Sequence, residues 1–385
     1  MRNIIRPTTR MNYERLHAEV GHKKIALMMN SSVVDERARC LLDILHDDWC
    51  LDISYLFGME HGVRGEQLAG VQVKSATDPG TGLPVYSLYD YPEWKPPVDL
   101  LRQVDAVIFS AQDIGVRHWT FTSWLMYLVK NAAEAGCEVY VLDRPNPITG
   151  TRIEGNLTCA GFFSLVGAFP YPLRHGMTMG ELAVMYNEEY HLGCKLKIIP
   201  LEGYSRDMWY EETGLLWVPP SPNMPTVETA LAFATTGLIQ GMNVSFGCGT
   251  TTPFFLVGAP WIDGTDLAGK LNTLDIPGVI FMNKYFEPTH SRYEKELCNA
   301  VLFRITDKEI FMPVATQIHI ITILMRDYGE KITFVKDQGS FDERCGSTRF
   351  REQLLAGECA DTIIEEWNIL AKEFAEKRSN YLLYR

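Results

Sequence analysis

Short apolar segments alternate with segments of helical periodicity over the first 150 residues. Apolar runs typical of buried strands occupy residues 23–30, 51–57, 105–110 and 138–142. Between them, residues 36–45 and 120–136 carry apolar side chains at helical spacing, and the second of these segments ends at a glycine. This alternation indicates parallel β-α-β units with right-handed crossovers. We therefore predict an α/β fold with a parallel sheet in the N-terminal part.

The pattern changes after about residue 155. A capping box from Thr178 to Glu181 begins a helix, and strands and helices without regular alternation follow. An amphipathic helix over residues 359–384 carries an apolar stripe that includes Ile363, Trp367 and Phe374. We expect a first domain over residues 1–155 and an α+β domain over residues 156–385.

Composition and charge narrow the classes of function. The chain has 385 residues and a net charge of −12 without a long basic run, so we expect no nucleic-acid partner. Its apolar runs are far shorter than the roughly 20 residues of a membrane span. No signal peptide is visible, and the nine cysteines form no C-x-x-C pair. These features favour a cytoplasmic protein with free thiols and without a membrane partner.

Polar clusters follow three of the predicted strands. They are Glu60, His61, Arg64 and Glu66 after the second strand, Gln112, Asp113 and Arg117 after the third, and Asp143, Arg144 and Asn146 after the fourth. The carboxyl ends of parallel strands meet at one edge of a sheet, where ligands bind in open α/β folds. We therefore predict that these side chains gather around one pocket.

Glu60 is the leading candidate for a functional residue. A structural turn needs glycine and one Asn or Asp, whereas this turn holds two glutamates, a histidine and an arginine. The other acidic residues have alternative interpretations. Asp113 could form an ion pair at a helix start, Asp143 could belong to a turn, and Glu66 could be a solvated loop residue.

Two further segments could contact a ligand. A rigid proline-rich stretch presents Asn223, and a glycine-rich loop presents Asn243, Thr250 and Thr251. That loop is not a P-loop, because no G-K-[ST] follows it. No G-x-G-x-x-G, H-E-x-x-H or G-x-S-x-G motif is present, so we expect no cofactor and no metal.

Carboxylates and arginines without a cofactor motif point to acid–base chemistry on a polar substrate. Glycoside hydrolysis uses one carboxylic acid and a second carboxylate, and a 2-acetamido sugar can supply its own acetamide as nucleophile. Aromatic side chains stack on sugar faces. The chain has four tryptophans near the motif loops, namely Trp94, Trp119, Trp217 and Trp261.

Several longer stretches of the sequence resemble those of a known protein family. In FGMEHGVRGEQLAG, QDIGVRHWTF, LDRPNPITGTRIEG and NVSFGCGTTTPF, among others, the chain resembles the NamZ-like exo-β-N-acetylmuramidase family. The resemblance implies a Rossmann-like N-terminal domain, a smaller C-terminal domain and an active site between them. It also implies release of N-acetylmuramic acid from peptidoglycan fragments, with the family's E-H-G glutamate at Glu60. The chain departs from the family pattern at Met59, Ser110, Cys248 and Phe255.

We therefore predict a glycoside hydrolase acting on a small amino-sugar substrate. Glu60 would be the general acid, His61 would orient it, and Asp113 or Asp143 would be the second acidic group. The remaining residues would bind substrate: Arg64, Glu66, Gln112, Arg117, Arg144, Asn146, Asn223, Asn243, Thr250 and Thr251. One alternative is a non-catalytic sugar or acidic-ligand binding protein on the same scaffold. Another is a metal-dependent hydrolase using Glu60, His61 and Asp143.

Overall fold

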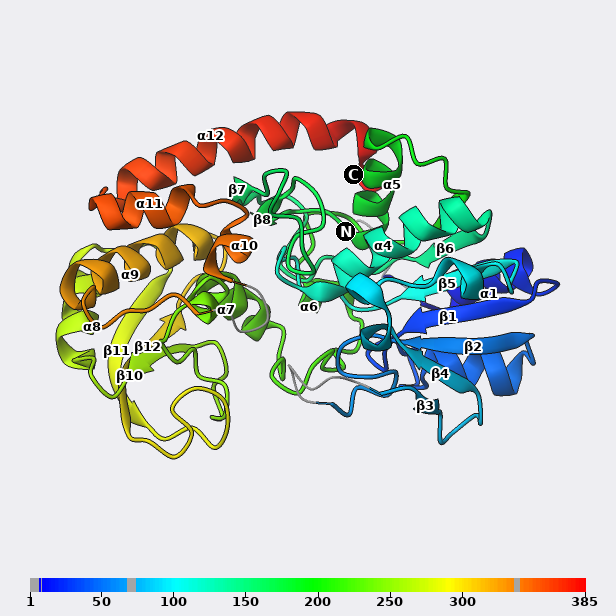
Figure 1. Ribbon diagram of the computed structural model, residues 1–385, viewed down its shortest axis with the longest axis horizontal. Coiled ribbons are helices and arrows are strands. Elements are labelled where there is room, and N and C mark those ends of the chain that lie inside the picture. The colour runs from blue at the N-terminus through cyan, green and yellow to red at the C-terminus, as the bar shows by residue number, and fades with distance from the viewer. Residues whose placement is uncertain (1–6, 8, 68–73, 336–339) are drawn as a thin grey trace, which may run out of the picture.

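The N-terminal domain is built on a seven-stranded sheet in the order β3-β4-β2-β1-β5-β6-β9 (Figure 1). The computed structural model describes residues 7, 9–67, 74–335 and 340–385. All neighbouring strands of the sheet are parallel except β3 and β4. The strands are β1 (Ile25–Met29), β2 (Ile53–Gly58), β3 (Ala76–Thr77), β4 (Pro84–Ser87), β5 (Ala106–Ser110), β6 (Glu138–Leu142) and β9 (Leu196–Ile199). The four predicted strands are confirmed as β1, β2, β5 and β6.

Helices cover both faces of this sheet. They are α1 (Thr9–Val20), α2 (Leu41–Asp43), α3 (Val98–Leu101), α4 (Thr120–Ala135) and α5 (Met179–Glu189); the short α6 (Tyr210–Thr213) lies toward the other domain (Figure 1). As predicted, α4 ends at Gly136, which adopts a left-handed conformation with φ 74°. The helix expected over residues 36–45 begins only at Leu41. The Asp35 carboxylate accepts hydrogen bonds from the backbone N–H groups of Arg37 and Arg39 and holds that segment in a turn.

The C-terminal domain combines a three-stranded antiparallel sheet with helices. The sheet has the order β10-β12-β11, with β10 (Leu256–Ala259), β11 (Val279–Phe286) and β12 (Cys298–Ile305). The helices are α7 (Glu228–Thr236), α8 (Gly264–Thr273), α9 (Pro313–Tyr328), α10 (Phe341–Cys345), α11 (Arg349–Ala356) and α12 (Ala360–Arg378). A two-stranded ribbon of β7 (Glu154–Leu157) and β8 (Pro172–Arg174) lies between the domains beneath α12 (Figure 1). No helix in the described ranges combines the length and apolarity needed to cross a bilayer.

The N-terminal sheet continues beyond the boundary that we expected near residue 155. Strand β9 pairs in parallel with β6, with Val139 opposite Leu196 and Leu142 opposite Ile199. A division at residue 155 would therefore cut this sheet. The hydrophobic pattern alone does not reveal that a later strand returns to it.

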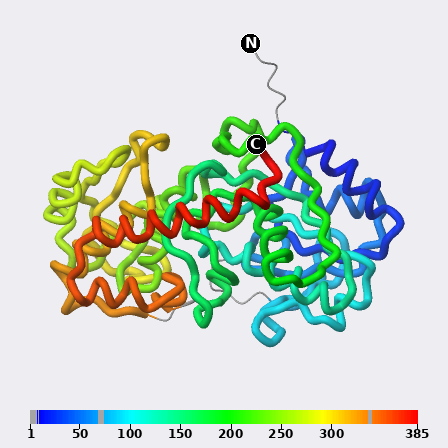
Figure 2. Tube along the Cα trace, turned by 90° about the horizontal axis from the view of Figure 1, so that it is seen from above, coloured from blue at the N-terminus to red at the C-terminus, as the bar shows by residue number. Residues whose placement is uncertain are grey.

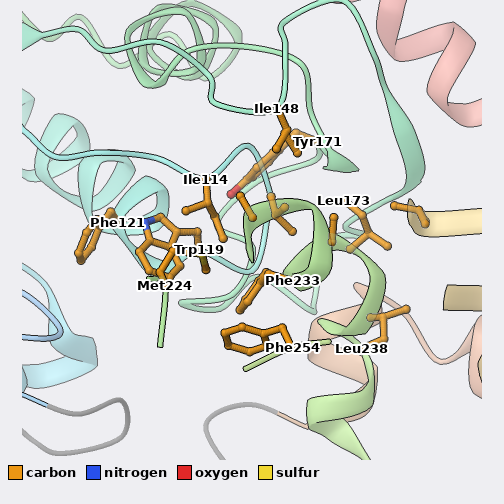
Figure 3. Packing of buried hydrophobic residues seen from close by; sticks show 14 of the residues in the cluster. Ile114, Trp119, Phe121, Ile148, Tyr171, Leu173, Met224, Phe233, Leu238 and Phe254 are labelled. Carbon is orange, nitrogen blue, oxygen red and sulfur yellow. The ribbon is translucent and has the colours of Figure 1, made fainter. Parts of the chain in front are cut away.

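One continuous apolar core joins the two domains. In Figure 3, Trp119, directly before α4, lies close to Phe233 and Phe254 of the C-terminal domain, and Phe121 lies on the other side of Trp119. The ring centroids of Trp119 and Phe233 are 6.1 Å apart, and those of Phe233 and Phe254 are 4.8 Å apart. Such an apolar contact holds domains in a fixed relative position more firmly than a polar one.

Helix α12 connects the domains a second time. It begins on the C-terminal domain and crosses toward α5 of the N-terminal domain, as Figures 1 and 2 show. The predicted apolar stripe is buried at Ile363, Trp367 and Phe374. At its end, the Arg378 guanidinium donates hydrogen bonds to the carbonyl oxygens of Gly150 and Gly176. The C-terminal residues therefore pack against the N-terminal domain.

Candidate active site

Glu60 lies at the carboxyl edge of the sheet, directly after β2. Its side chain is half-buried, and Oε2 accepts a 2.7 Å hydrogen bond from the Thr120 hydroxyl. Thr120 is the first residue of α4, where unpaired N–H groups carry partial positive charge that favours a nearby anion. Oε1 has no hydrogen-bond partner among the described residues. The carboxyl group is thus fixed at one oxygen and available at the other.

The turn that carries Glu60 is held by His61. The His61 backbone has φ 69°, and its Nδ1 lies 2.9 Å from the Gln67 carbonyl oxygen. The imidazole is buried and packs against the rings of Trp119 and Phe121. These contacts of His61 hold the turn that carries Glu60.

A hydrogen-bonded network joins the ends of β5 and β6 next to this turn. The Arg144 Nε donates to Gln112 Oε1 at 2.9 Å, and its Nη2 lies 3.4 Å from the Tyr210 hydroxyl. The Trp119 indole N–H donates to the Gln112 carbonyl oxygen at 3.3 Å. Since Trp119 also packs against His61, the network adjoins the Glu60 turn. The structure thus brings Gln112 and Arg144 together, as the edge rule predicts.

Asp113 keeps one carboxylate oxygen unpaired. Its Oδ2 accepts a 3.0 Å hydrogen bond from the Gly115 N–H and lies 3.2 Å from His175 Nε2, close enough for an ion pair but not aligned as a hydrogen bond. His175 Nδ1 accepts the Met177 N–H, so a neutral ring carries its proton on Nε2, toward Asp113. Oδ1 is buried and has no partner among the described residues.

Asp143, by contrast, is fully engaged at the start of α5. Its Oδ2 accepts hydrogen bonds from the hydroxyls of Thr178 (2.6 Å) and Tyr384 (2.8 Å), and its Oδ1 accepts the Gly180 N–H (2.9 Å). Burial raises the pKa of Asp143 to about 6, although these hydrogen bonds act in the opposite direction. The contacts give Asp143 a structural role, in place of the catalytic one that we expected. The sequence indicates an acidic residue at this edge of the sheet, but it does not show toward which neighbours the Asp143 side chain points.

Arg64 and Arg117 are also engaged by the protein itself. Arg64 forms a bidentate pair with Asp78, at 2.8 Å for both contacts, and a third hydrogen bond with Asp43, so the pKa of Asp78 is held well below its usual range. Arg117 is completely buried and donates to the carbonyl oxygens of Asn156 and Tyr171, among others. Burial lowers its pKa to about 10. Neither arginine is placed to bind substrate as we expected.

Two of the expected substrate-binding amides form hydrogen bonds with backbone groups of the protein. Asn146 donates to the Met177 carbonyl oxygen and accepts the Ile148 N–H. Asn243 pairs in the same way with Lys331 and Thr333. Both side chains therefore use a donor and an acceptor within the protein, mostly with segments distant in the sequence.

The other four candidates lie on the surface or in a loop. Thr250 donates its hydroxyl to the Gly247 carbonyl oxygen within the glycine-rich loop. Glu66 and Thr251 are exposed, and Asn223 is half-buried. The structure does not bring these residues into hydrogen-bond contact with Glu60.

Arg344 of α10 is a charged neighbour of Glu60 that the sequence did not reveal. The Arg344 carbonyl oxygen accepts hydrogen bonds from Arg117 Nη2 (2.9 Å) and His118 Nε2 (2.8 Å), which docks α10 against the segment before α4. Burial lowers the pKa of Arg344 to about 10, the positive charge of Arg292 acts in the same direction, and the negative charge of Glu60 opposes both. The candidate site therefore lies where the two domains meet.

The described residues hold no group of three or more His, Cys, Asp and Glu side chains that could bind a metal ion. The metal-dependent alternative needs Glu60, His61 and Asp143 to converge. Asp143 instead faces α5, and the His61 Nδ1 faces a backbone carbonyl. Asp143 and His61 therefore do not converge on Glu60 as the metal-dependent alternative requires.

Comparison with known proteins assigns the family. The N-terminal domain model of exo-β-N-acetylmuramidase NamZ matches residues 25–228, and the C-terminal domain model matches residues 231–384. The chain belongs to the NamZ family. The peptidoglycan β-N-acetylmuramidase NamZ of Bacillus subtilis (strain 168) is 40% identical over 362 residues, which cover 94% of this chain and 87% of that protein.

Solved structures agree with this assignment. A DUF1343 family protein from Bacteroides fragilis NCTC 9343 superposes with a TM-score of 0.89 and 32% identity, covering 100% of both chains. A second DUF1343 protein from the same strain gives a TM-score of 0.79 and 27% identity, covering 98% of this chain and 99% of the other. The two-domain α/β architecture is therefore shared across the whole chain.

The structure shows the contacts of three residues at which the chain departs from the NamZ family pattern. Ser110 donates its hydroxyl to the Leu142 carbonyl oxygen and links β5 to β6. Cys248 is buried, which raises its thiol pKa to about 12 against the opposing positive charge of Arg292. Phe255 is buried and packs against Phe303 with 5.5 Å between ring centroids. A guanidinium, that of Arg292, thus lies near Cys248 although residue 248 itself is not arginine.

Proposed function

We propose that this chain is an exo-acting glycoside hydrolase that releases a terminal β-linked amino sugar, N-acetylmuramic acid or a close relative, from peptidoglycan-type fragments. The observation that carries the proposal is Glu60, fixed by Thr120 at the start of α4 beside Arg344 of the other domain. Membership of the NamZ family and the activity of the Bacillus relative support it.

Glu60 is the proposed general acid. The Thr120 hydroxyl holds Oε2, so a proton on Oε1 would be delivered to the glycosidic oxygen of the leaving sugar. Proton transfer by a positioned side chain contributes roughly 10²–10⁴-fold to the rate. His61 acts through the turn and keeps Glu60 in place.

Asp113 is the better candidate for the second acidic group. Its buried Oδ1 still has a lone pair to offer, whereas both oxygens of Asp143 are occupied. A 2-acetamido sugar can use its own acetamide oxygen as nucleophile, and a carboxylate then needs only to orient the acetamide N–H. We propose that Asp113 has this role.

Positive charge at the site fits an anionic sugar. Arg144 is held by Gln112 at the edge of the sheet, and Arg344 is close enough to Glu60 for their charges to interact. A guanidinium binds a carboxylate through two parallel hydrogen bonds, which suits the lactyl group of muramic acid. All nine cysteines are free, in keeping with a small fragment as substrate in the cytoplasm.

The test is Glu60→Gln assayed on a disaccharide of N-acetylmuramic acid linked β to N-acetylglucosamine. Gln keeps the shape but has no proton to donate, so we expect kcat to fall at least about 100-fold with an unchanged melting temperature. The effect should be smaller on a nitrophenyl glycoside, whose leaving group needs little protonation.

Glu134→Gln is the matched control. Glu134 is exposed on the same helix, about 21 Å along α4 from Thr120. Full activity of Glu60→Gln on the disaccharide would refute the assignment. Binding of the disaccharide without turnover by the unaltered protein would support the non-catalytic alternative instead.

A further inference from the structure

Trp94 is an exposed aromatic residue on the segment between β4 and α3. It leaves 40% of its surface accessible to solvent. Both Glu93 (φ 53°) and Trp94 (φ 55°) adopt the left-handed backbone conformation, which is unfavourable for residues with a Cβ. Two such residues in succession persist only where the surrounding structure imposes them, and such sites are often functional.

Helix α4 holds this segment in place. The Trp124 indole N–H donates to the Trp94 carbonyl oxygen at 3.0 Å, and the Asn131 amide donates to the Pro96 carbonyl oxygen at 2.8 Å. Tyr89 packs edge-on against both Trp94 (5.7 Å between centroids) and Trp124 (5.6 Å). The exposed indole is therefore anchored on its inner side and open on its outer side.

The same helix relates Trp94 to Glu60. Thr120, which holds the Glu60 carboxyl group, and Trp124, which holds the Trp94 backbone, are four residues apart on α4. Residues at this spacing lie on one helix face, about 6 Å apart along the axis. Tyr89, which packs against Trp94 and Trp124, is also a neighbour of Glu60: burial and then the negative charge of Glu60 raise the pKa of its phenol. Trp94 and Glu60 are thus both held by side chains of the first turns of α4.

We propose that Trp94 is the stacking platform for the leaving-group sugar, the residue on the far side of the scissile bond from the terminal amino sugar. This inference rests on the proposed function and names a second binding subsite for it. The proposed acid donates to the oxygen between two sugars, so each of them needs a binding surface next to Glu60.

Charge and exposure decide which sugar Trp94 receives. The terminal sugar carries a carboxylate and fits the side with Arg344, which is buried. The leaving sugar is neutral, and the rest of the fragment must extend from it into solvent. The Tyr89–Trp94 surface is apolar and partly exposed, so it fits a neutral ring at the mouth of the site.

The test compares two substrates that share the terminal sugar. One is the β-linked disaccharide, and the other is the β-glycosyl fluoride of N-acetylmuramic acid, whose leaving group is a single atom. For Trp94→Ala we expect kcat/KM on the disaccharide to fall about tenfold, with no change on the fluoride. For Trp94→Phe, kcat/KM on the disaccharide should lie between the values of the unaltered protein and of Trp94→Ala. The ratio of the two kcat/KM values does not depend on the fraction of enzyme that is folded.

Tyr190→Ala is the matched control. Tyr190 is similarly exposed, at 42%, but it follows the last residue of α5, whose first turn binds Asp143 at the carboxyl edge of the sheet. Tyr190 therefore lies at the opposite edge of the sheet from Glu60. For Tyr190→Ala, the ratio of kcat/KM on the disaccharide to kcat/KM on the fluoride should equal that of the unaltered protein. If Trp94→Ala leaves the ratio unchanged, the subsite is refuted. If the unaltered protein cleaves neither substrate, the proposed function fails instead.

Discussion

Replacing Asp143 by Asn should remove a pH-dependent cost in stability. The carboxyl group is enclosed by α5 and Tyr384, and burial raises its pKa from 3.8 to about 6. A shift of about two units corresponds to about 3 kcal/mol between the two protonation states. Because the pKa is higher in the folded protein than in the unfolded chain, the stabilisation is complete below about pH 4. It is lost as the pH rises to about 6.

The Asn variant imitates the protonated acid at every pH. Its Oδ1 can still accept the Gly180 N–H, and any cost from altered contacts with Thr178 and Tyr384 is the same at each pH. We expect the free energy of unfolding of the unaltered protein to fall by about 2 kcal/mol relative to the variant between pH 4 and pH 6.5, the rest of the change lying below pH 4. Above that range the difference should stay constant.

Urea denaturation followed by tryptophan fluorescence, at half-unit steps from pH 4 to pH 7.5, measures this difference. Asp99→Asn is the control, because the Asp99 side chain is 90% exposed, and its profile should run parallel to that of the unaltered protein. Parallel profiles for Asp143→Asn as well would show that burial does not dominate the ionisation of Asp143. That result would refute the reasoning.

Two further predictions concern the tail and the thiols. Tyr384→Phe should lower the free energy of unfolding by about 1–3 kcal/mol, because the buried Leu201 N–H loses its acceptor; an unchanged melting temperature would contradict this. Alkylation with iodoacetamide at pH 7.5, followed by mass spectrometry, should modify Cys359 long before Cys248. Cys359 is exposed and a hydrogen bond with Thr362 lowers its pKa, whereas burial raises that of Cys248 to about 12; equal rates would refute the assignment.

The parallel sheet could be predicted because its central strands are local and strongly apolar. The predicted strands correspond to β1, β2, β5 and β6, and the predicted glycine end of α4 is present at Gly136. Strand β9 was not predicted as part of this sheet, because its partner β6 lies more than 50 residues earlier in the chain. Pairing over that distance depends on how the intervening helix packs, which a hydrophobic pattern does not encode.

Site residues could be predicted from the sequence only where a side chain suited to catalysis directly follows a strand of the sheet. Glu60 follows a strand, so the edge rule places it correctly. Asp143 follows a strand as well, but its oxygens turn toward the N-terminus of α5. Arg344 stands in a short helix far along the chain, and nothing in its sequence surroundings indicates that α10 docks beside Glu60. Long-range docking of this kind is visible only in three dimensions.

The return of the chain to its first domain has a consequence for biosynthesis. Tyr384 completes the hydrogen bonding of Asp143 and of Leu201, from which it is separated by 183 positions. A ribosome adds roughly 5–20 residues per second, so these groups wait about 10–50 seconds for their partner. Throughout that time the nascent chain contains all strands of the N-terminal sheet but still lacks Tyr384, the hydrogen-bond partner of Asp143 and Leu201. The N-terminal domain is therefore synthesised before the C-terminal domain, but its hydrogen bonds at Asp143 and Leu201 are completed only when Tyr384 has been added.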